Sequence, residues 1–113
     1  ARSVTKILEG VVTDGTGAKA AIPGFRVAGK TGTAQKIDPR TGAYSASRFV
    51  ASFAGYAPAD SPQLAMIVVI DEPLGDTQGG TVAAPVFSRV GEQVLSYLGV
   101  PSDAPVTLAM AAR

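Results

Sequence analysis

The chain has 113 residues, of which 46% are hydrophobic and 17% are charged. This composition predicts a packed globular core, forming one domain or part of a larger one, rather than a disordered segment. The 10 basic and 9 acidic side chains nearly cancel. We therefore expect no nucleic-acid partner and no electrostatic attraction to an anionic membrane.

Two residue types are missing, and their absence narrows the possible chemistry. Without cysteine the chain has no disulfide and no thiolate metal ligand. Without histidine it cannot assemble a Ser-His-Asp or Cys-His mechanism from its own residues. We expect no metal site and no cofactor, and the lone pair Asp71-Glu72 is expected to end a strand. No apolar run is long enough to span a bilayer.

The first predicted element is an amphipathic helix. Its apolar residues recur at i, i+3, i+4, i+7 and i+8, and Gly15 and Gly17 end it. These apolar residues are Val4, Ile7, Leu8, Val11 and Val12. Because the chain starts in this helix, and without methionine, we expect it to be a fragment of a longer protein.

Three β-runs follow the helix. They cover residues 25–36, 48–57 and 64–70, and a strong turn signal at 38–42 separates the first two. The third run is apolar at every position, which predicts a strand covered on both faces. Short turns between successive strands imply antiparallel pairing, because a parallel pair needs a long crossover.

A glycine-rich loop and a second long helix complete the pattern. The loop contains Gly75, Gly79 and Gly80, and the helix is expected from about Ala84 to Leu98. Its predicted buried stripe is Val86, Phe87, Val90, Val94 and Leu98. The fold class is therefore α+β, an antiparallel sheet flanked by helices, with one domain over 1–100 and a flexible tail over 101–113.

One segment of the first strand fits two incompatible motifs. Residues 24–31 match the phosphate-loop pattern G-x-x-x-x-G-K-[ST], whereas 30–32 spell the K-T-G box of penicillin-recognising serine enzymes. A phosphate loop must follow a buried strand and open a helix. Here Pro23 precedes the motif, and no helical stripe follows Thr31. The nucleotide-binding alternative is therefore remote.

The sequence on both sides of the K-T-G box resembles the C-terminal part of class B penicillin-binding proteins, most closely the septal peptidoglycan transpeptidases. The resemblance runs in order and spacing from the first helix to about Pro101. It is carried by the segments 11–17, 22–36, 52–59, 70–73 and 79–87.

This resemblance implies a D,D-transpeptidase, in which a serine attacks the D-Ala-D-Ala carbonyl of a peptidoglycan stem peptide and β-lactams acylate the same serine. Lys30 would hold the substrate carboxylate and join the proton network. Thr31 and Thr33 would hydrogen-bond that carboxylate, and the Thr33 backbone N–H would form half of the oxyanion hole. Gly32 would permit close approach of the substrate, and the Gly79-Gly80 loop would border the cleft.

The chain also departs from the family pattern. It contains no asparagine, so the second box S-x-N is absent, and we reject Ser3-Val4-Thr5-Lys6 as the nucleophile box S-x-x-K because it lies too close to Lys30. Relatives often carry aromatic residues where this chain has Thr77-Gln78. The isolated chain is therefore expected to be inactive. A β-lactam-sensing receptor domain of the same fold is the alternative.

The resemblance also implies a location and partners. The parent protein would be anchored by an N-terminal helix, with its catalytic part on the extracytoplasmic face of the cytoplasmic membrane. Its partners would be stem peptides, β-lactams, the remainder of the same domain, and cell-division or cell-wall synthesis proteins. Alone, the chain is expected to self-associate through an exposed edge at 64–70.

Overall fold

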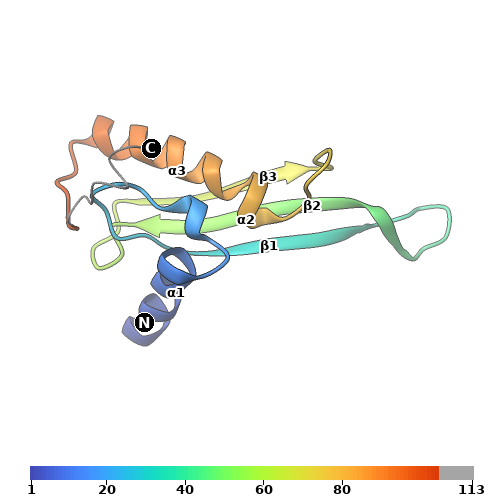
Figure 1. The fold of residues 1–113 in the computed structure, drawn as a ribbon, viewed down its shortest axis with the longest axis horizontal. Helices are drawn as coiled ribbons and strands as arrows, with labels where there is room; N and C mark the ends of the chain where they lie inside the picture. The colour runs from blue at the N-terminus through green and yellow to red at the C-terminus, as the bar shows by residue number, and fades with distance from the viewer. Residues whose placement is uncertain (105–113) are drawn as a thin grey trace.

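The computed structural model describes residues 1–104 and contains one three-stranded antiparallel sheet in the order β1-β2-β3. Helices α2 and α3 lie over one face of the sheet, while α1 packs against β1 (Figure 1). The α+β prediction is confirmed. The elements are α1 (Arg2–Asp14), the short 3-10 helix η1 (Ala18–Ala20), β1 (Ala28–Ile37), β2 (Tyr44–Ala57), β3 (Leu64–Asp71), α2 (Gly79–Val82) and α3 (Ala84–Leu98).

The first two strands differ from their predicted bounds. Strand β1 begins at Ala28 rather than Phe25, because the Phe25 N–H donates to the Ile22 carbonyl at 3.1 Å in a turn before the strand. Strand β2 begins earlier than predicted, at Tyr44. The pairing there is irregular, and Ser45 Oγ accepts hydrogen bonds from the Ser47 and Arg48 N–H groups of its own strand at 3.2 and 3.0 Å. Sequence periodicity does not detect such a local side-chain bond.

The predicted turn between β1 and β2 is present. Asp38 donates its backbone N–H to the Ala43 carbonyl at 2.8 Å, and its carboxylate accepts the Arg40 N–H at 2.9 Å. This backbone hydrogen bond, followed by the Arg40 side chain, lowers the pKa of Asp38 below its ordinary value. The aspartate therefore closes the hairpin in its charged form.

Strand β3 corrects one expectation. Its residues alternate between half-buried and exposed, and Ile67 and Val69 remain 64% and 56% exposed. The prediction of a strand covered on both faces is wrong for residues 1–104, because α2 and α3 cover one face only. Within the described sheet β3 is also an edge strand.

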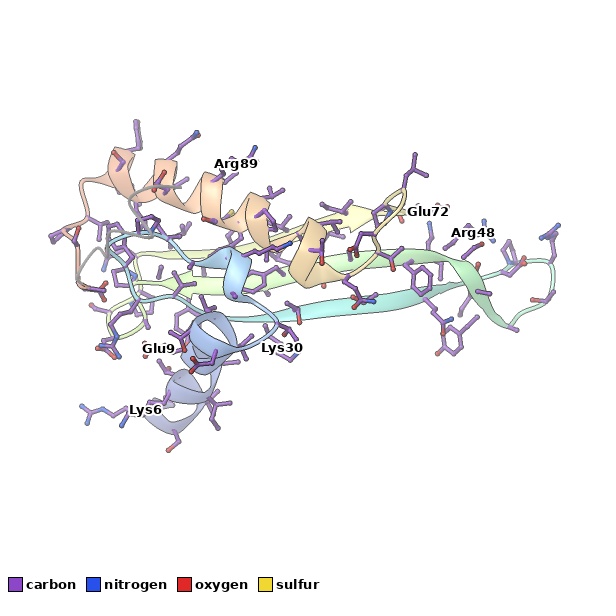
Figure 2. The ribbon with its side chains drawn as sticks, viewed as in Figure 1. Lys6, Glu9, Lys30, Arg48, Glu72 and Arg89 are labelled. Carbon is purple, nitrogen blue, oxygen red and sulfur yellow. The ribbon has the colours of Figure 1, made fainter. Side chains whose placement is uncertain are left out.

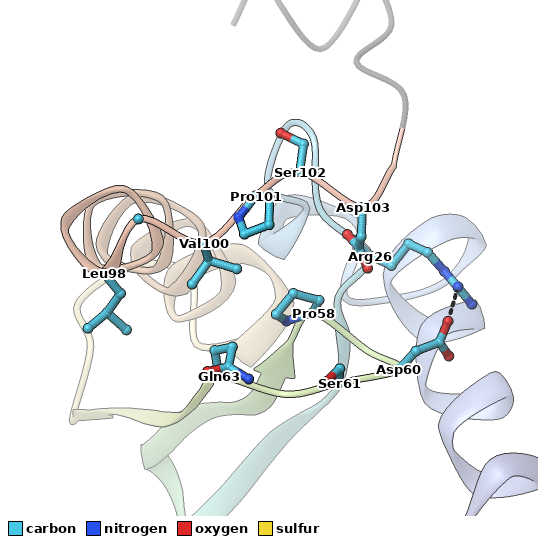
Figure 3. A pocket seen from close by; sticks show the side chains of 11 residues that line it. Arg26, Pro58, Asp60, Ser61, Gln63, Leu98, Val100, Pro101, Ser102 and Asp103 are labelled. Atoms are coloured by element: carbon cyan, nitrogen blue, oxygen red, sulfur yellow. Dashed lines mark hydrogen bonds and ion pairs between the residues drawn. The ribbon is translucent and has the colours of Figure 1, made fainter.

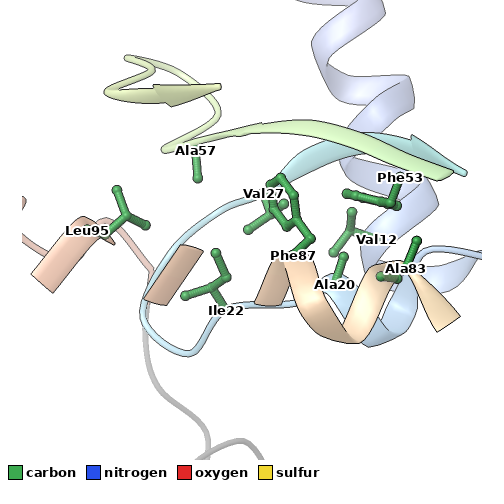
Figure 4. Close-up of a cluster of buried hydrophobic side chains, with 10 residues drawn as sticks. Val12, Ala20, Ile22, Val27, Phe53, Ala57, Ala83, Phe87 and Leu95 are labelled. Carbon is green, nitrogen blue, oxygen red and sulfur yellow. The ribbon is translucent and has the colours of Figure 1, made fainter. Parts of the chain in front are cut away.

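The core lies between the sheet and α3 and is centred on two aromatic rings. Phe53 and Phe87 are fully buried and meet edge to face, with ring centroids 4.8 Å apart (Figure 4). Such a pair adds to the stabilisation that comes from burial alone. The other buried members of the cluster are Val12, Ala20, Ile22, Val27, Ala57, Ala83, Ala84 and Leu95.

Helix α3 has the predicted bounds but buries a different stripe. Its buried residues are Ala84, Phe87, Ser88, Gly91 and Leu95. Of the predicted stripe only Phe87 is buried; Val86 and Val90 are each 39% exposed. The cause is close packing at Gly91, where a Cβ would lie 2.7 Å from Ile22 Cδ1.

Helix α1 is amphipathic as predicted, yet most of its apolar face is uncovered by the rest of the described chain. Val12 is its one buried residue, and Val4 and Ile7 are 56% and 68% exposed. The helix is held to the sheet partly by a polar contact, a 2.8 Å hydrogen bond between Thr5 Oγ1 and the Tyr56 hydroxyl.

Arg26 contacts three parts of the chain that are distant from it in sequence. Its guanidinium donates to the Glu9 carboxylate of α1 at 3.0 and 2.8 Å and pairs with Asp60 in the turn after β2 (Figure 3). Its backbone N–H donates to Asp103 Oδ1 at 2.9 Å. The hydrogen bond to Glu9 is the main reason that the pKa of Arg26 is raised. The arginine therefore ties α1 and the turn after β2 to the segment before β1.

The predicted tail over 101–113 lies largely outside the described residues. Of the described part, Asp103 and Ala104 each donate a backbone N–H to the Gly24 carbonyl, at 3.0 and 3.1 Å. No helix within residues 1–104 combines the length and the apolar character needed to cross a membrane.

Candidate active site

The K-T-G box lies in β1, the edge strand of the described sheet on the side of α1. Thr31 and Thr33 pair with Phe53 and Ala51 of β2, both fully buried on the face that α3 covers. Because side chains alternate along a strand, both threonines point to that face and Lys30 points to the other. Figure 2 shows Lys30 on the part of β1 that passes α1.

One hollow brings together four of the sequence-predicted site residues. Thr31, Thr33, Gly79 and Gly80 all line it. The other lining residues are Gly15, Thr16, Ala18, Lys19, Gln78 and Thr81. A hollow of hydroxyl groups with an exposed lysine at its side suits an anionic group such as a carboxylate.

Lys30 lines a different hollow, together with Leu8 and Tyr56 on the opposite face of the sheet. Its ammonium nonetheless reaches back to its own strand, where Nζ donates to the Thr31 carbonyl at 3.0 Å. A longer contact of 3.5 Å joins Nζ to Thr31 Oγ1. The positive charge is therefore close to the threonine hydroxyl, although the lysine side chain leaves the strand on the other side.

Gly79 and Gly80 begin a helix rather than lying in the predicted loop. Gly79 and Gly80 open α2, which lies directly on the β1–β2 backbone. A Cβ on Gly79 would overlap the carbonyl oxygens of Ser52 and Gly32, and one on Gly80 would overlap the Thr16 carbonyl oxygen. Close approach of backbone to backbone therefore requires glycine at both positions.

Thr33 is held by the start of this helix. The Gly79 N–H donates to Thr33 Oγ1 at 3.1 Å, and the Thr33 hydroxyl makes a long 3.5 Å contact with Gln78 Oε1. The turn before α2 is fixed by Asp76, whose carboxylate accepts the Gln78 N–H at 2.9 Å. Gln78 thus places an amide at the rim of the hollow.

Sequence reasoning missed Thr16 and Lys19, which also line the hollow. Thr16 Oγ1 lies 3.1 Å from Thr31 Oγ1, and the exposed Lys19 is in η1. The only local sign was that two glycines flank Thr16, which marks a tight loop but says nothing of what the loop touches. The contact with β1 is a long-range feature of the fold.

The phosphate-loop alternative is wrong. After Thr31 the chain continues as strand to Ile37, and no helix opens at Lys30-Thr31. The sheet is antiparallel, so the parallel β-α-β core that such a loop needs is also absent from the described residues.

The acidic pair at the end of β3 has a structural partner. Asp71 and Glu72 both accept hydrogen bonds from the Lys36 ammonium, at 3.0 and 2.7 Å. The hydrogen bond to Glu72, followed by the hydrogen bond to Asp71, raises the pKa of Lys36 above its ordinary value. Over residues 1–104 no three histidine, cysteine, aspartate or glutamate side chains gather in a way that could hold a metal ion.

The fold and the strand-borne box define a penicillin-recognising transpeptidase domain. The family model described as penicillin binding protein transpeptidase domain matches residues 1–92, and the chain belongs to this family.

Individual relatives agree with this assignment. The chain is 46% identical over 100 residues to stage V sporulation protein D of Bacillus subtilis, covering 88% of the chain and 15% of that protein. It is 44% identical over 108 residues to peptidoglycan D,D-transpeptidase FtsI of Escherichia coli K12, covering 94% of the chain and 18% of that protein. The chain thus spans less than a fifth of these relatives.

Solved structures are also similar. The apo transpeptidase domain of penicillin-binding protein 3 from Burkholderia pseudomallei superposes with a TM-score of 0.80 at 43% identity, over 92% of this chain and 31% of that one. Penicillin-binding protein 3 from Mycobacterium tuberculosis, solved with ampicillin, gives a TM-score of 0.79 at 34% identity, over 95% of this chain and 26% of that one.

Proposed function

We propose that this chain is the C-terminal part of the transpeptidase domain of a serine D,D-transpeptidase that crosslinks peptidoglycan stem peptides. The observation that carries the proposal is the hollow in which Thr31 and Thr33, on the strand of the box, meet the start of α2. Family membership and the similarity to an ampicillin-bound penicillin-binding protein support it.

In this mechanism the chain supplies the wall that binds the substrate carboxylate. The hydroxyl groups of Thr31 and Thr33 donate to the carboxylate, and the Lys30 ammonium lowers its energy electrostatically. The Thr33 backbone N–H belongs to an edge strand and donates to the oxyanion that forms at the attacked carbonyl. Gly32 would permit close approach of the substrate backbone, and within the sheet a Cβ at this position would also lie 2.6 Å from Ser52 Oγ.

The nucleophile must come from residues outside this chain. A serine attacks the D-Ala-D-Ala carbonyl carbon, D-alanine leaves with the electron pair of the broken C–N bond and a proton, and the acyl group passes to an amine of a second stem peptide. Ser3 is not that serine, because it lies in the first turn of the exposed, amphipathic α1. The remainder of the domain would carry the S-x-x-K and S-x-N boxes.

The test is covalent labelling with a fluorescent penicillin. The full-length protein is expected to be labelled stoichiometrically, and prior incubation with unlabelled penicillin should block the labelling, whereas the 113-residue chain alone stays unlabelled. Stoichiometric labelling of the chain alone would show that the nucleophile lies within it. A full-length protein that takes up no label would overturn the proposed function. A sensor domain would also be acylated, so crosslinking activity on stem peptides is the measurement that distinguishes it from the transpeptidase.

The partners and location follow the same proposal. The parent enzyme works on the outer face of the cytoplasmic membrane, held by an N-terminal helix and by contacts with cell-division or cell-wall synthesis proteins. Its ligands are D-Ala-D-Ala stem peptides and β-lactams. The relative named peptidoglycan D,D-transpeptidase FtsI supports a role in cell-wall synthesis.

The chain alone is expected to self-associate. Strand β3 is an edge of the described sheet and exposes Ile67 and Val69 on one face, and such edges recruit other chains. Sedimentation of the isolated chain should give species larger than a monomer at high concentration. Val69→Lys should shift the distribution toward monomer, and Gln93→Lys, which adds the same charge at an exposed position of α3, should not. A monomer at every concentration counts against the expectation.

A further inference from the structure

Thr16 occupies a fixed place beside the K-T-G strand. The backbone N–H groups of Gly15 and Gly17 both donate to the Val11 carbonyl, at 3.1 and 3.0 Å. On the other side the Thr16 carbonyl lies against the start of α2, so close that Gly80 has no room for a Cβ. The loop is therefore held by backbone contacts on both sides, and its one side chain with a hydroxyl faces β1.

That hydroxyl meets the Thr31 hydroxyl. The two Oγ1 atoms are 3.1 Å apart, and both side chains line the hollow of the candidate site. The distance exceeds the usual O–H···O separation of about 2.7–2.8 Å. A hydrogen bond of this length is weak, so it can orient the Thr31 hydroxyl at small energetic cost.

The donors and acceptors around Thr31 Oγ1 determine where the hydrogen of its hydroxyl can point. A hydroxyl has one hydrogen and two lone pairs, whereas an ammonium can only donate. Lys30 Nζ, 3.5 Å from Thr31 Oγ1, therefore approaches a lone pair of that oxygen. When the Thr16 hydroxyl donates to the other lone pair, the hydrogen of Thr31 is left for a third group in the hollow.

We propose that Thr16 is a positioning residue, which directs the Thr31 O–H toward the carboxylate of the bound substrate or β-lactam. This inference rests on the proposed function, because it concerns the same carboxylate. Thr16 need not touch the ligand; it acts through Thr31. The occupied lone pairs also make the Thr31 hydroxyl a better donor, since chains of hydrogen bonds polarise one another.

The test uses the full-length protein and the second-order rate constant for acylation by a fluorescent penicillin. Thr16→Val, which keeps the shape and removes the hydroxyl, should lower this constant about fivefold, roughly the worth of one weak hydrogen bond. Thr16→Ser should retain most of the rate. Thr13→Val is the matched control, because the Thr13 hydroxyl bonds within α1, to the Glu9 carbonyl and the Asp14 carboxylate, and it should leave the rate unchanged.

A double-mutant cycle separates positioning from a general effect on structure. If Thr16 acts through Thr31, the variant carrying both Thr16→Val and Thr31→Val should be no slower than Thr31→Val alone. Additive losses, or a Thr16→Ser variant as slow as Thr16→Val, would overturn the proposal. So would a Thr16→Val variant that is acylated at the rate of the unmodified protein. If the unmodified protein is not acylated at all, it is the proposed function that fails.

Discussion

Gly79→Ala in the full-length protein should reduce penicillin acylation by more than about tenfold and lower the temperature of unfolding. The added Cβ would overlap the carbonyl oxygens of Ser52 and Gly32, which belong to paired strands and cannot move independently. Overpacking of this kind costs about 1–3 kcal/mol or more. Helix α2 would have to lift from β1, which would break the bond from the Gly79 N–H to Thr33 Oγ1.

Gly10→Ala is the matched control for this prediction. Gly10 lies within α1, and a Cβ there would meet no atom within 4 Å. The same chemical change should therefore be neutral or stabilising by up to about 1 kcal/mol, because alanine favours helix. Calorimetry and acylation rates of both variants check the pair. A Gly79→Ala protein that melts and reacts like the unmodified one would refute the close seating of α2.

Phe87→Ala is expected to be the most destabilising single change in the core. Phe87 is fully buried, and its ring packs edge to face on Phe53, with 62° between the ring planes. Removing a buried aromatic ring costs about 3–5 kcal/mol. Urea unfolding of the full-length protein, followed by a signal from this domain, should show a loss of that size.

The control for Phe87→Ala is another aromatic residue of the same helix. Tyr97 is 89% exposed, so Tyr97→Ala should change the free energy of unfolding by less than about 0.5 kcal/mol. Phe87→Leu should fall between the two, because it keeps part of the buried volume. A loss below about 1 kcal/mol for Phe87→Ala would mean that the two rings do not form the centre of the core.

The sequence was sufficient for the order of the two long helices and the three strands, and for the pairing of the strands. Short turns between apolar runs allow only antiparallel neighbours, and the turn at Asp38 has the composition that closes a hairpin. It failed for the buried stripe of α3. A count of apolar residues favoured Val86 and Val90, but the helix approaches the core through Gly91, and small residues have little weight in such a count.

The candidate site was predictable in part for a similar reason. Alternation along a strand places Thr31 and Thr33 on one face whatever the surroundings are. The contact of Thr16 with Thr31 depends instead on where the loop after α1 lies, which is a property of the whole fold. That Gly79 and Gly80 begin a helix was also hidden, because glycine pairs ordinarily indicate loops.

The contacts of Arg26 with Glu9, Asp60 and Asp103, here called the Arg26 junction, affect the order in which the chain folds. Arg26 is 17 residues from Glu9, 34 from Asp60 and 77 from Asp103 along the chain. Contacts between distant residues must close long loops and form slowly, whereas the β1–β2 hairpin closes a short turn. The hairpin should therefore form early and the junction last, and during synthesis the junction cannot be complete until the ribosome has passed residue 103. Hydrogen-exchange labelling of the Arg26 amide during refolding would follow this final step.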